Sequence, residues 1–146
     1  MTDAEPKSLT DRAAFTLWAH DKLRYADTDR QGHVNNAVFA TFLETGRVAF
    51  LYDPTAPLAP PGCEFVLARV GVDFRAELRW PGVVDFGSAI RAIGRSSVTI
   101  GQGLFVGAQC VATAESVVVL TDATTRRSTP MPEALRARLA ALAPRS

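Results

Sequence analysis

Hydrophobic residues between positions 36 and 52 recur at three- and four-residue steps, the spacing that places side chains on one face of an α-helix. Apolar residues also occupy much of the opposite side, and only Glu44 and Arg47 interrupt them. The preceding Asn35 and Asn36 are residues that cap helix N-termini by accepting free backbone amide protons. This pattern predicts a central helix over residues 36–52 that is buried nearly all round.

The remaining segments are typical of strands, turns and one short helix. Residues 65–75 alternate between apolar and polar positions, which predicts a half-buried strand with Val66, Val70 and Phe74 on its inner face. Four prolines between residues 53 and 62 exclude a helix there and predict a loop. β-branched runs bounded by turn residues predict further strands, and an amphipathic stretch predicts a C-terminal helix. The ranges are 15–23, 83–93, 98–106 and 110–120 for the strands and 133–142 for the helix.

The order of these segments indicates an α+β fold. A strand and a long buried helix are followed by four strands with short connections, and consecutive strands joined by short turns pair antiparallel. One apolar helix needs the inner face of such a sheet to cover it, so we expect an antiparallel sheet wrapped around the helix. Residues 1–12 have the composition of a polar N-terminal tail, and residues 13–146 form one predicted domain.

Composition and charge narrow the class of protein. The chain has 146 residues, of which 47% are hydrophobic and 21% charged, which favours a globular domain over a disordered chain. A formal net charge of +1 provides no field that would attract nucleic acid or an anionic membrane surface. The N-terminus carries acidic residues and no apolar core, so it does not resemble a signal peptide, and we expect a cytoplasmic location. Cys63 and Cys110 have no metal-ligand spacing and are expected to be buried free thiols.

Candidate chemistry is concentrated in residues 25–36, directly before the predicted helix. Asp27, Asp29, Gln31 and His33 lie here, where the helix N-terminus offers free amides and a positive dipole end. The two aspartates also match the opening of a calcium-binding loop, but its twelfth position is Val38, where a bidentate glutamate is required. We therefore expect no metal and no cofactor. Turn and cap hydrogen bonds are the alternative role for the aspartates, and a structural hydrogen bond is the alternative for His33.

Several motifs in this order resemble one enzyme family. The motifs are Tyr25-x-Asp27-Thr28-Asp29-x-x-Gly32-His33-Val34, Phe42-Leu43-Glu44-x-x-Arg47, Val72-x-Phe74, Pro81-Gly82 and Gly94-x-Ser96-Ser97. With them the chain resembles the hotdog-fold 4-hydroxybenzoyl-CoA and acyl-CoA thioesterases from about Phe15 to Leu120. At the end of the first motif, His33-Val34-Asn35-Asn36 is more similar to acyl-ACP thioesterases. The resemblance thus implies thioester hydrolysis and leaves both coenzyme A and acyl carrier protein open as the carrier.

The resemblance also assigns roles. It implies that Asp29 is the catalytic carboxylate, acting as general base or as nucleophile, and that amides around Asn35 and Asn36 polarise the thioester carbonyl. Gln31 and His33 match polar positions that would place water and the carboxylate. Glu44 is a further candidate, because a charge on an otherwise apolar helix needs a partner or a polar interface. A hydroxyacyl dehydratase of the same fold and a non-catalytic acyl-binding module are the alternatives.

Partners follow from the same reasoning. An acyl-CoA or acyl-ACP thioester is the expected substrate, and nucleic acid and membranes are not expected partners. Proteins that the chain resembles form homodimers or dimers of dimers (homotetramers), and a sheet around one helix leaves edges for a partner to cover. We expect residues 66–74 of one chain to face Asp29 of the other. Five arginines are candidates for binding the carrier phosphates: Arg69, Arg75, Arg79, Arg91 and Arg95.

Overall fold

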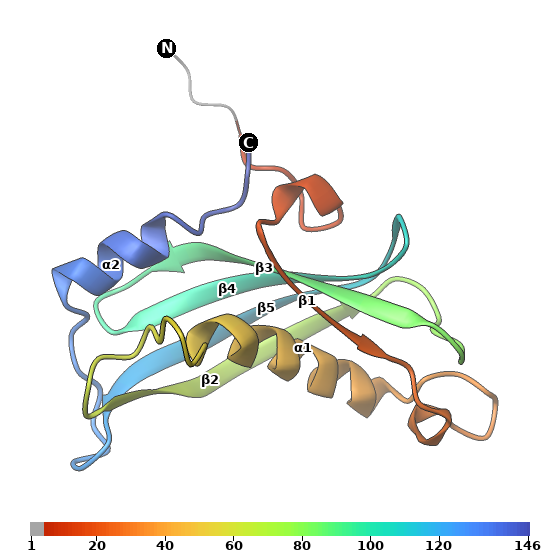
Figure 1. Ribbon diagram of the computed structural model, residues 1–146, viewed down its shortest axis with the longest axis horizontal. Helices are drawn as coiled ribbons and strands as arrows, with labels where there is room; N and C mark the ends of the chain where they lie inside the picture. The colour runs from red at the N-terminus through yellow and green to blue at the C-terminus, as the bar shows by residue number, and fades with distance from the viewer. Residues whose placement is uncertain (1–4) are drawn as a thin grey trace.

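One antiparallel sheet and one long helix make up most of the chain (Figure 1). The computed structural model describes residues 5–146. The strands are β1 (Leu17–Lys22), β2 (Cys63–Phe74), β3 (Val83–Ile93), β4 (Ser97–Val106) and β5 (Gln109–Asp122). The helices are α1 (Asn36–Leu51) and α2 (Glu133–Ala140), and two single 3-10 turns are η1 (Arg12–Ala14) and η2 (Tyr25–Asp27). The predicted α+β class, with the sheet packed around a central helix, is confirmed.

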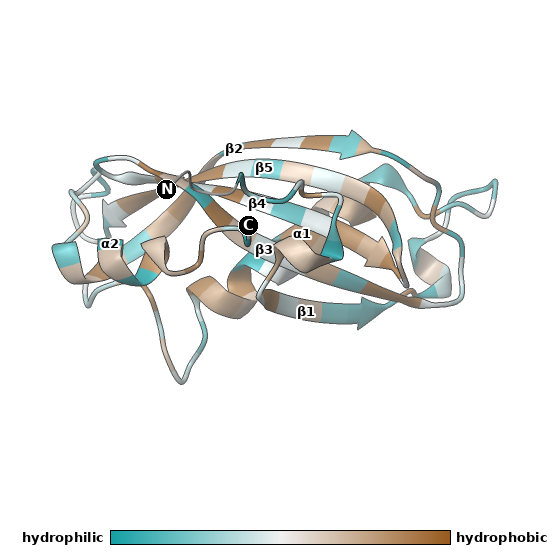
Figure 2. Ribbon diagram, turned by 90° about the horizontal axis from the view of Figure 1, so that it is seen from above, coloured by the Kyte–Doolittle hydropathy of each residue, from teal (hydrophilic) through white to brown (hydrophobic). Residues whose placement is uncertain are grey.

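Sheet order differs from the prediction at one connection. The order is β1-β3-β4-β5-β2, so β2 and β3 are consecutive in sequence but do not pair. β2 pairs with β5, and the segment 75–82 then crosses to β3, which pairs with β1 and β4. The expectation that consecutive strands pair was wrong here, because residues 75–82 carry the chain past β5 and β4 to β3 instead of forming a tight turn. Figure 2 shows β1 and β2 at opposite edges.

The core lies between α1 and the inner face of the sheet. Phe39, Phe42 and Leu43 of α1 pack against Val84 and Phe86 of β3, and all five side chains are nearly inaccessible to solvent. Phe42 and Phe86 stack with ring centroids 5.4 Å apart. A second cluster joins the end of α1 to the inner faces of β4 and β5 and to α2. Both clusters are apolar, so hydrophobic burial fixes the position of α1 on the sheet.

α1 is less buried than its sequence predicts. It lies against β1 and β3, which leaves the side away from those strands open. Val48 is 45% exposed, and Ala40, Glu44 and Thr45 are exposed as well. The prediction of burial nearly all round was therefore wrong for the single chain. A helix with apolar residues on every side is not necessarily buried on every side within one chain, because an exposed apolar face has the same sequence pattern as a buried one.

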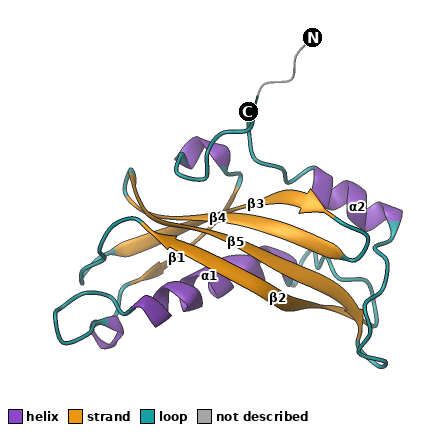
Figure 3. Ribbon diagram, turned by 180° about the vertical axis from the view of Figure 1, so that it is seen from behind, coloured by secondary structure: helices purple, strands orange, loops and turns teal. Residues whose placement is uncertain are grey.

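β2 is also more exposed than predicted. Val66 is 42% exposed, Val70 43% and Phe74 51%, although all three were expected on a buried face. The strand is at the edge of the sheet, and a bulge between Leu67 and Arg69 interrupts its register with β5. α1 lies toward the other edge and reaches β2 only in part, through the contact of Phe39 with Phe74 and the hydrogen bonds of the Tyr52 hydroxyl to the Phe65 backbone. Figure 3 shows the molecule from behind, with β2 at the edge of the sheet.

The N-terminal segment packs on the outer face of the sheet. Residues 1–4 of the predicted tail lie outside the described residues. From residue 5 onward, the Lys7 amide donates to the Arg145 carbonyl (2.8 Å) and Leu9 packs against a small cluster around Phe15 and Phe105. A Cβ at Gly103 would lie 2.7 Å from the Leu9 carbonyl oxygen, so only glycine permits this approach. Strand β1 consequently begins at Leu17, two residues later than predicted, after η1.

Candidate active site

The loop between η2 and α1 is built around a tight turn. The Gly32 amide donates to the Asp29 carbonyl (3.0 Å), and the Asp29 amide donates to the His33 carbonyl (2.7 Å). Asp is favoured at the first position of such a turn, and Gly32 has a φ of 79°, a left-handed conformation that favours glycine. Val34 then pairs with Thr28 in an isolated antiparallel bridge. The sequence therefore closes a hairpin-like loop whose tip points into solvent beside the start of α1.

Asp29 holds this turn with one oxygen and leaves the other free. Its Oδ1 accepts hydrogen bonds from the amides of Gln31 (2.9 Å) and His33 (3.2 Å). Its Oδ2 makes no hydrogen bond or ion pair with any of the described residues. The side chain is exposed. One carboxylate oxygen thus fixes the geometry of the loop while the second remains available to a bound molecule or to water.

Asp27, two residues earlier, is in the opposite situation. It is only 3% exposed, and its carboxylate accepts hydrogen bonds from the Arg24 amide (2.9 Å) and from Nε and Nη2 of the Arg24 side chain (3.1 and 2.8 Å). Burial raises the pKa of the Asp27 carboxyl, but the Arg24 hydrogen bonds and positive charge outweigh burial, and the pKa is lowered. Asp27 therefore anchors the loop and has no free oxygen to offer a substrate.

α1 begins directly beside this loop. Asn35 caps the helix, because its side-chain oxygen accepts from the Ala37 amide (3.0 Å), while its own amide donates to the Asp27 carbonyl (2.9 Å). The amide of Asn36, the first helical residue, has no partner within residues 5–146. Helix N-termini carry partial positive charge from such free amides. Of the two asparagines predicted to surround the polarising amides, only Asn36 keeps its amide free.

His33 contacts the segment that crosses from β2 to β3. Its Nε2 lies 2.7 Å from Arg79 Nη2 and 3.2 Å from Glu77 Oε2, and Arg79 Nη2 is 3.5 Å from the same Glu77 oxygen. Val34 is held to the same segment by a hydrogen bond from its amide to the Leu78 carbonyl (2.8 Å). Glu77 was not predicted as a neighbour of the site. Its only sequence signal was a charged residue in the segment after β2, and the crossover that brings it here is not encoded locally.

Four of the six predicted site residues line one cavity of about 430 Å³. They are Asp29, Gln31, His33 and Asn36. Phe39 and Phe74 form its apolar wall, with ring centroids 5.1 Å apart, and Glu77 and Leu78 close another side. This volume is within the usual range for small-molecule sites, which are concave, mainly apolar and carry a few convergent polar groups. The cavity therefore joins an open carboxylate, a histidine and a helix N-terminus.

Asn35 and Glu44 do not line this cavity. Glu44 is exposed on α1, two turns beyond Asn36, and makes no ion pair with Arg47 in the described chain. Arg47 is 6% exposed and its Nη1 has no hydrogen-bond partner within residues 5–146. Burial lowers the pKa of the Arg47 guanidinium, and the negative charge of Glu44 acts in the opposite direction.

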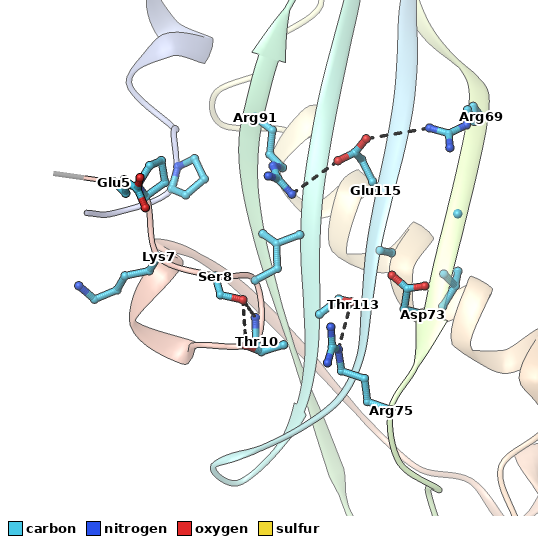
Figure 4. A pocket seen from close by; sticks show the side chains of 16 residues that line it. Glu5, Lys7, Ser8, Thr10, Arg69, Asp73, Arg75, Arg91, Thr113 and Glu115 are labelled. Carbon is cyan, nitrogen blue, oxygen red and sulfur yellow. Dashed lines mark hydrogen bonds and ion pairs between the residues drawn. The ribbon is translucent and has the colours of Figure 1, made fainter. Parts of the chain in front are cut away.

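A larger groove, of about 900 Å³, lies on the outer face of the sheet beneath the N-terminal segment (Figure 4). Glu115 lies 4.0 Å from Arg69 and 3.5 Å from Arg91, and Arg75 Nε donates to Thr113 Oγ1 (3.4 Å). None of the predicted site residues lines this groove, and its arginines are partly balanced by Glu115 and Asp73. Of the five candidate arginines, Arg75 lines both this groove and the Asp29 cavity, and Arg79 contacts His33 of that cavity.

The sequence profile of the Thioesterase-like superfamily matches residues 23–139, which include every residue of the Asp29 cavity. The chain belongs to this superfamily. No protein of curated function matches it significantly.

Solved structures of the superfamily's fold are similar over most of the chain. A thioesterase from Thermus thermophilus, solved with coenzyme A and Zn, is 30% identical with a TM-score of 0.78, over 88% of this chain and 95% of that one. The PA5185 protein of Pseudomonas aeruginosa is 25% identical with a TM-score of 0.80, covering 92% and 96%. A predicted thioesterase from Bacillus stearothermophilus is 26% identical with a TM-score of 0.78, covering 89% and 98%.

Two other properties bear on function. Within residues 5–146, no three His, Cys, Asp or Glu side chains are grouped closely enough to hold a metal ion. No helix in that range is both long and apolar enough to cross a membrane. Cys63 and Cys110 are free thiols, as predicted, but each is only half-buried.

Proposed function

We propose that this protein is a thioesterase that hydrolyses an acyl-CoA or acyl-ACP thioester to a carboxylic acid and a thiol. The observation that carries the proposal is the cavity lined by Asp29, which has a free carboxylate oxygen, by His33 and by Asn36, which has a free amide. Membership of the Thioesterase-like superfamily supports it. A relative crystallised with coenzyme A supports a coenzyme A ester as the first substrate to test.

The chemistry needs few groups. In the proposed reaction the thioester carbonyl oxygen lies against the Asn36 amide, where the partial charge of the helix N-terminus stabilises the negative charge that develops. Oδ2 of Asp29 removes a proton from water, the water oxygen attacks the carbonyl carbon, and the C–S bond breaks. The thiol has a pKa of about 8.5, so the sulfur leaves as thiolate without a strong general acid.

Asp29 also has the geometry for a nucleophilic route. Its free oxygen could attack the carbonyl carbon directly, forming an anhydride that water then opens. A single turnover in ¹⁸O-labelled water distinguishes the two routes. Direct attack by water places ¹⁸O in the product acid, whereas opening of the anhydride at the aspartyl carbon leaves ¹⁸O in the protein.

His33, Gln31 and Arg79 are assigned positioning roles. The Gln31 and His33 amides orient the Asp29 carboxylate, and the contact of His33 with Arg79 and Glu77 fixes the loop against the crossover segment. Arg75, which lines this cavity, and Arg79, which contacts His33, are the arginines best placed to meet a carrier phosphate, because guanidinium groups bind phosphate well.

The proposed assembly is a homodimer, or a dimer of such dimers. β2 has an unpaired edge and exposes Val66, Leu67, Val70 and Phe74, which a second copy would cover. Phe74 also lines the Asp29 cavity, so the covered strand and the site are adjacent. Light scattering at assay concentration tests this, and an active monomer would contradict it.

The function is tested by a thiol-release screen over aryl, short, medium and long acyl-CoA esters, repeated with acyl-ACP. We expect thiol release above the spontaneous rate for at least one class. Formation of an enoyl thioester from a hydroxyacyl substrate without thiol release would favour a dehydratase. Tight binding of acyl-CoA without turnover would favour an acyl-binding module.

A further inference from the structure

A second cavity, of about 380 Å³, lies between the C-terminal half of α1, strands β1 and β3, the loop that follows α1, and the C-terminal end of α2. Its wall is mainly apolar, and the volume is within the range of small-molecule sites. It shares no lining residue with the Asp29 cavity. Along α1, the buried Phe42 and Leu43 separate the residues that line the two cavities. The apolar wall includes Leu17, Trp18, Phe50, Leu58, Phe86 and Leu142.

One buried hydroxyl on this wall has unused hydrogen-bonding capacity. Ser88 is 2% exposed, and its Oγ accepts a hydrogen bond from Gln102 Nε2 (3.1 Å). Its own O–H has no acceptor in the described part of the chain. Gln102 is fully buried and donates also to the Leu43 carbonyl (3.0 Å), and its Oε1 has no partner within the same residues. Buried polar groups are normally paired, so this pair points to a missing partner.

Gly46 lets α1 pack closely against this polar pair. A Cβ at Gly46 would lie 2.9 Å from Gln102 Nε2 and 3.6 Å from Ser88 Oγ, so any side chain there would press on the pair. Ala49, one turn further along α1, also lines the cavity and is small. The helix therefore presents its two smallest residue types where the cavity is open.

The charged residues of this cavity balance each other. Asp53 accepts hydrogen bonds from the amide and hydroxyl of Thr55, and Arg138 donates to the carbonyls of Ala56 and Pro57. Both are thus engaged by the loop after α1, and their charges are opposite. The cavity therefore favours neither an anionic nor a cationic ligand. Either ion would also lose its hydration on entering an apolar cavity.

We propose that this cavity is a second binding site, which takes a neutral, mainly apolar small molecule whose single carbonyl oxygen accepts a hydrogen bond from the Ser88 hydroxyl. A ligand held there contacts α1, the loop after it, β1, β3 and the end of α2 together. Because such a ligand binds the folded state and not the unfolded state, it raises the melting temperature of the protein.

Trp18 provides the readout. It borders the cavity while its ring packs against Phe15 and Phe105, whereas the other tryptophan, Trp80, packs against Tyr25 beside the Asp29 loop. In a Trp80→Phe background, titration with 2-nonanone is expected to change Trp18 fluorescence saturably with one site per chain. Nonanoate and nonylamine, which carry similar chains with opposite charges, are expected to bind more weakly than the ketone.

Two pairs of matched variants locate the site. Ala49→Leu fills the cavity and is expected to weaken ketone binding by more than about 10-fold, while Ala40→Leu, also an exposed alanine of α1, is expected to leave it unchanged. Ser88→Ala removes the donor and is expected to weaken binding by about 2- to 10-fold. Ser116→Ala, a buried serine that lines none of these cavities, is its control.

The proposal is overturned if no saturable binding is seen, if the two variants of a pair weaken binding equally, or if an ion binds more tightly than the ketone. It is also overturned if ketone binding and self-association of the protein exclude each other, since the cavity would then be covered by a second copy of the chain. Binding that persists in Asp29→Asn, with or without thioesterase activity, keeps this site distinct from the proposed function.

Discussion

Asp27 and Asp29 are two carboxylates of one loop with opposite environments. Asp27 is buried and receives hydrogen bonds from three Arg24 nitrogens, whereas Asp29 is exposed, uses one oxygen to hold two backbone amides and keeps the other free. Asp29 lines a cavity with a helix N-terminus, and Asp27 does not. The same side chain two residues apart is thus a structural anchor in one place and a candidate reacting group in the other. The difference lies in which oxygens the protein itself has already paired.

The strongest test of this comparison is Asp29→Asn. Asparagine keeps an oxygen for the Gln31 and His33 amides, so the loop should fold normally, but the free basic oxygen becomes an amide nitrogen. We expect kcat on the best thioester to fall by about 10²- to 10⁴-fold, with KM little changed. Steady-state thiol release measures both values. A variant with near-normal kcat would remove Asp29 from the chemistry.

His33→Ala should have a smaller effect on turnover. The contacts with Arg79 and Glu77 would be lost and the loop would shift, so we expect kcat/KM to fall by up to about 10²-fold with the fold intact. Circular dichroism checks the fold. His20 is the other histidine of the chain, is exposed on β1, and makes His20→Ala the control. Full activity in His33→Ala would make His33 a structural residue only.

Asp27→Asn should affect stability more than chemistry. It removes a charged acceptor from Arg24, and we expect the free energy of unfolding to fall by about 1–3 kcal/mol, with kcat of the folded protein nearly unchanged. The pKa of Asp27 is lowered in the folded state, so its stabilisation is complete above the unfolded pKa of about 3.9 and is lost as the pH falls through the folded value.

Denaturant titrations of wild type and Asp27→Asn should therefore differ at neutral pH and converge in acid. If Asp27→Asn reduces kcat more than Asp29→Asn does in folded protein, the contrast between the two carboxylates is wrong.

Glu44→Gln should have the smallest effect. Glu44 is exposed and does not line the cavity, so a change within about 0.5 kcal/mol in stability, and a similarly small change in kcat/KM, is expected. Thiol release under the same conditions measures it. A loss beyond about 10-fold would instead assign Glu44 to a site completed by a second copy of the chain.

Local pattern was sufficient for the elements and for the position of the loop. Periodicity predicted α1 to within one residue at its C-terminal end, and β3 was predicted as 83–93 and observed as Val83–Ile93. Asn35 was predicted to cap the helix and does so through its side chain. These features depend on the spacing and hydrogen bonds of residues only a few positions apart, so the local sequence is enough to predict them.

Only the tertiary structure decided which groups meet. The crossover of segment 75–82 brings Glu77 and Arg79 to His33, the edge position of β2 leaves its apolar residues exposed, and the Arg24 side chain rather than any motif separates Asp27 from Asp29. Each of these outcomes depends on pairing between distant segments or on which oxygen is already occupied. Sequence by itself determined that a polar loop precedes a helix of this length, while packing across the sheet determined which of its side chains remain free to act.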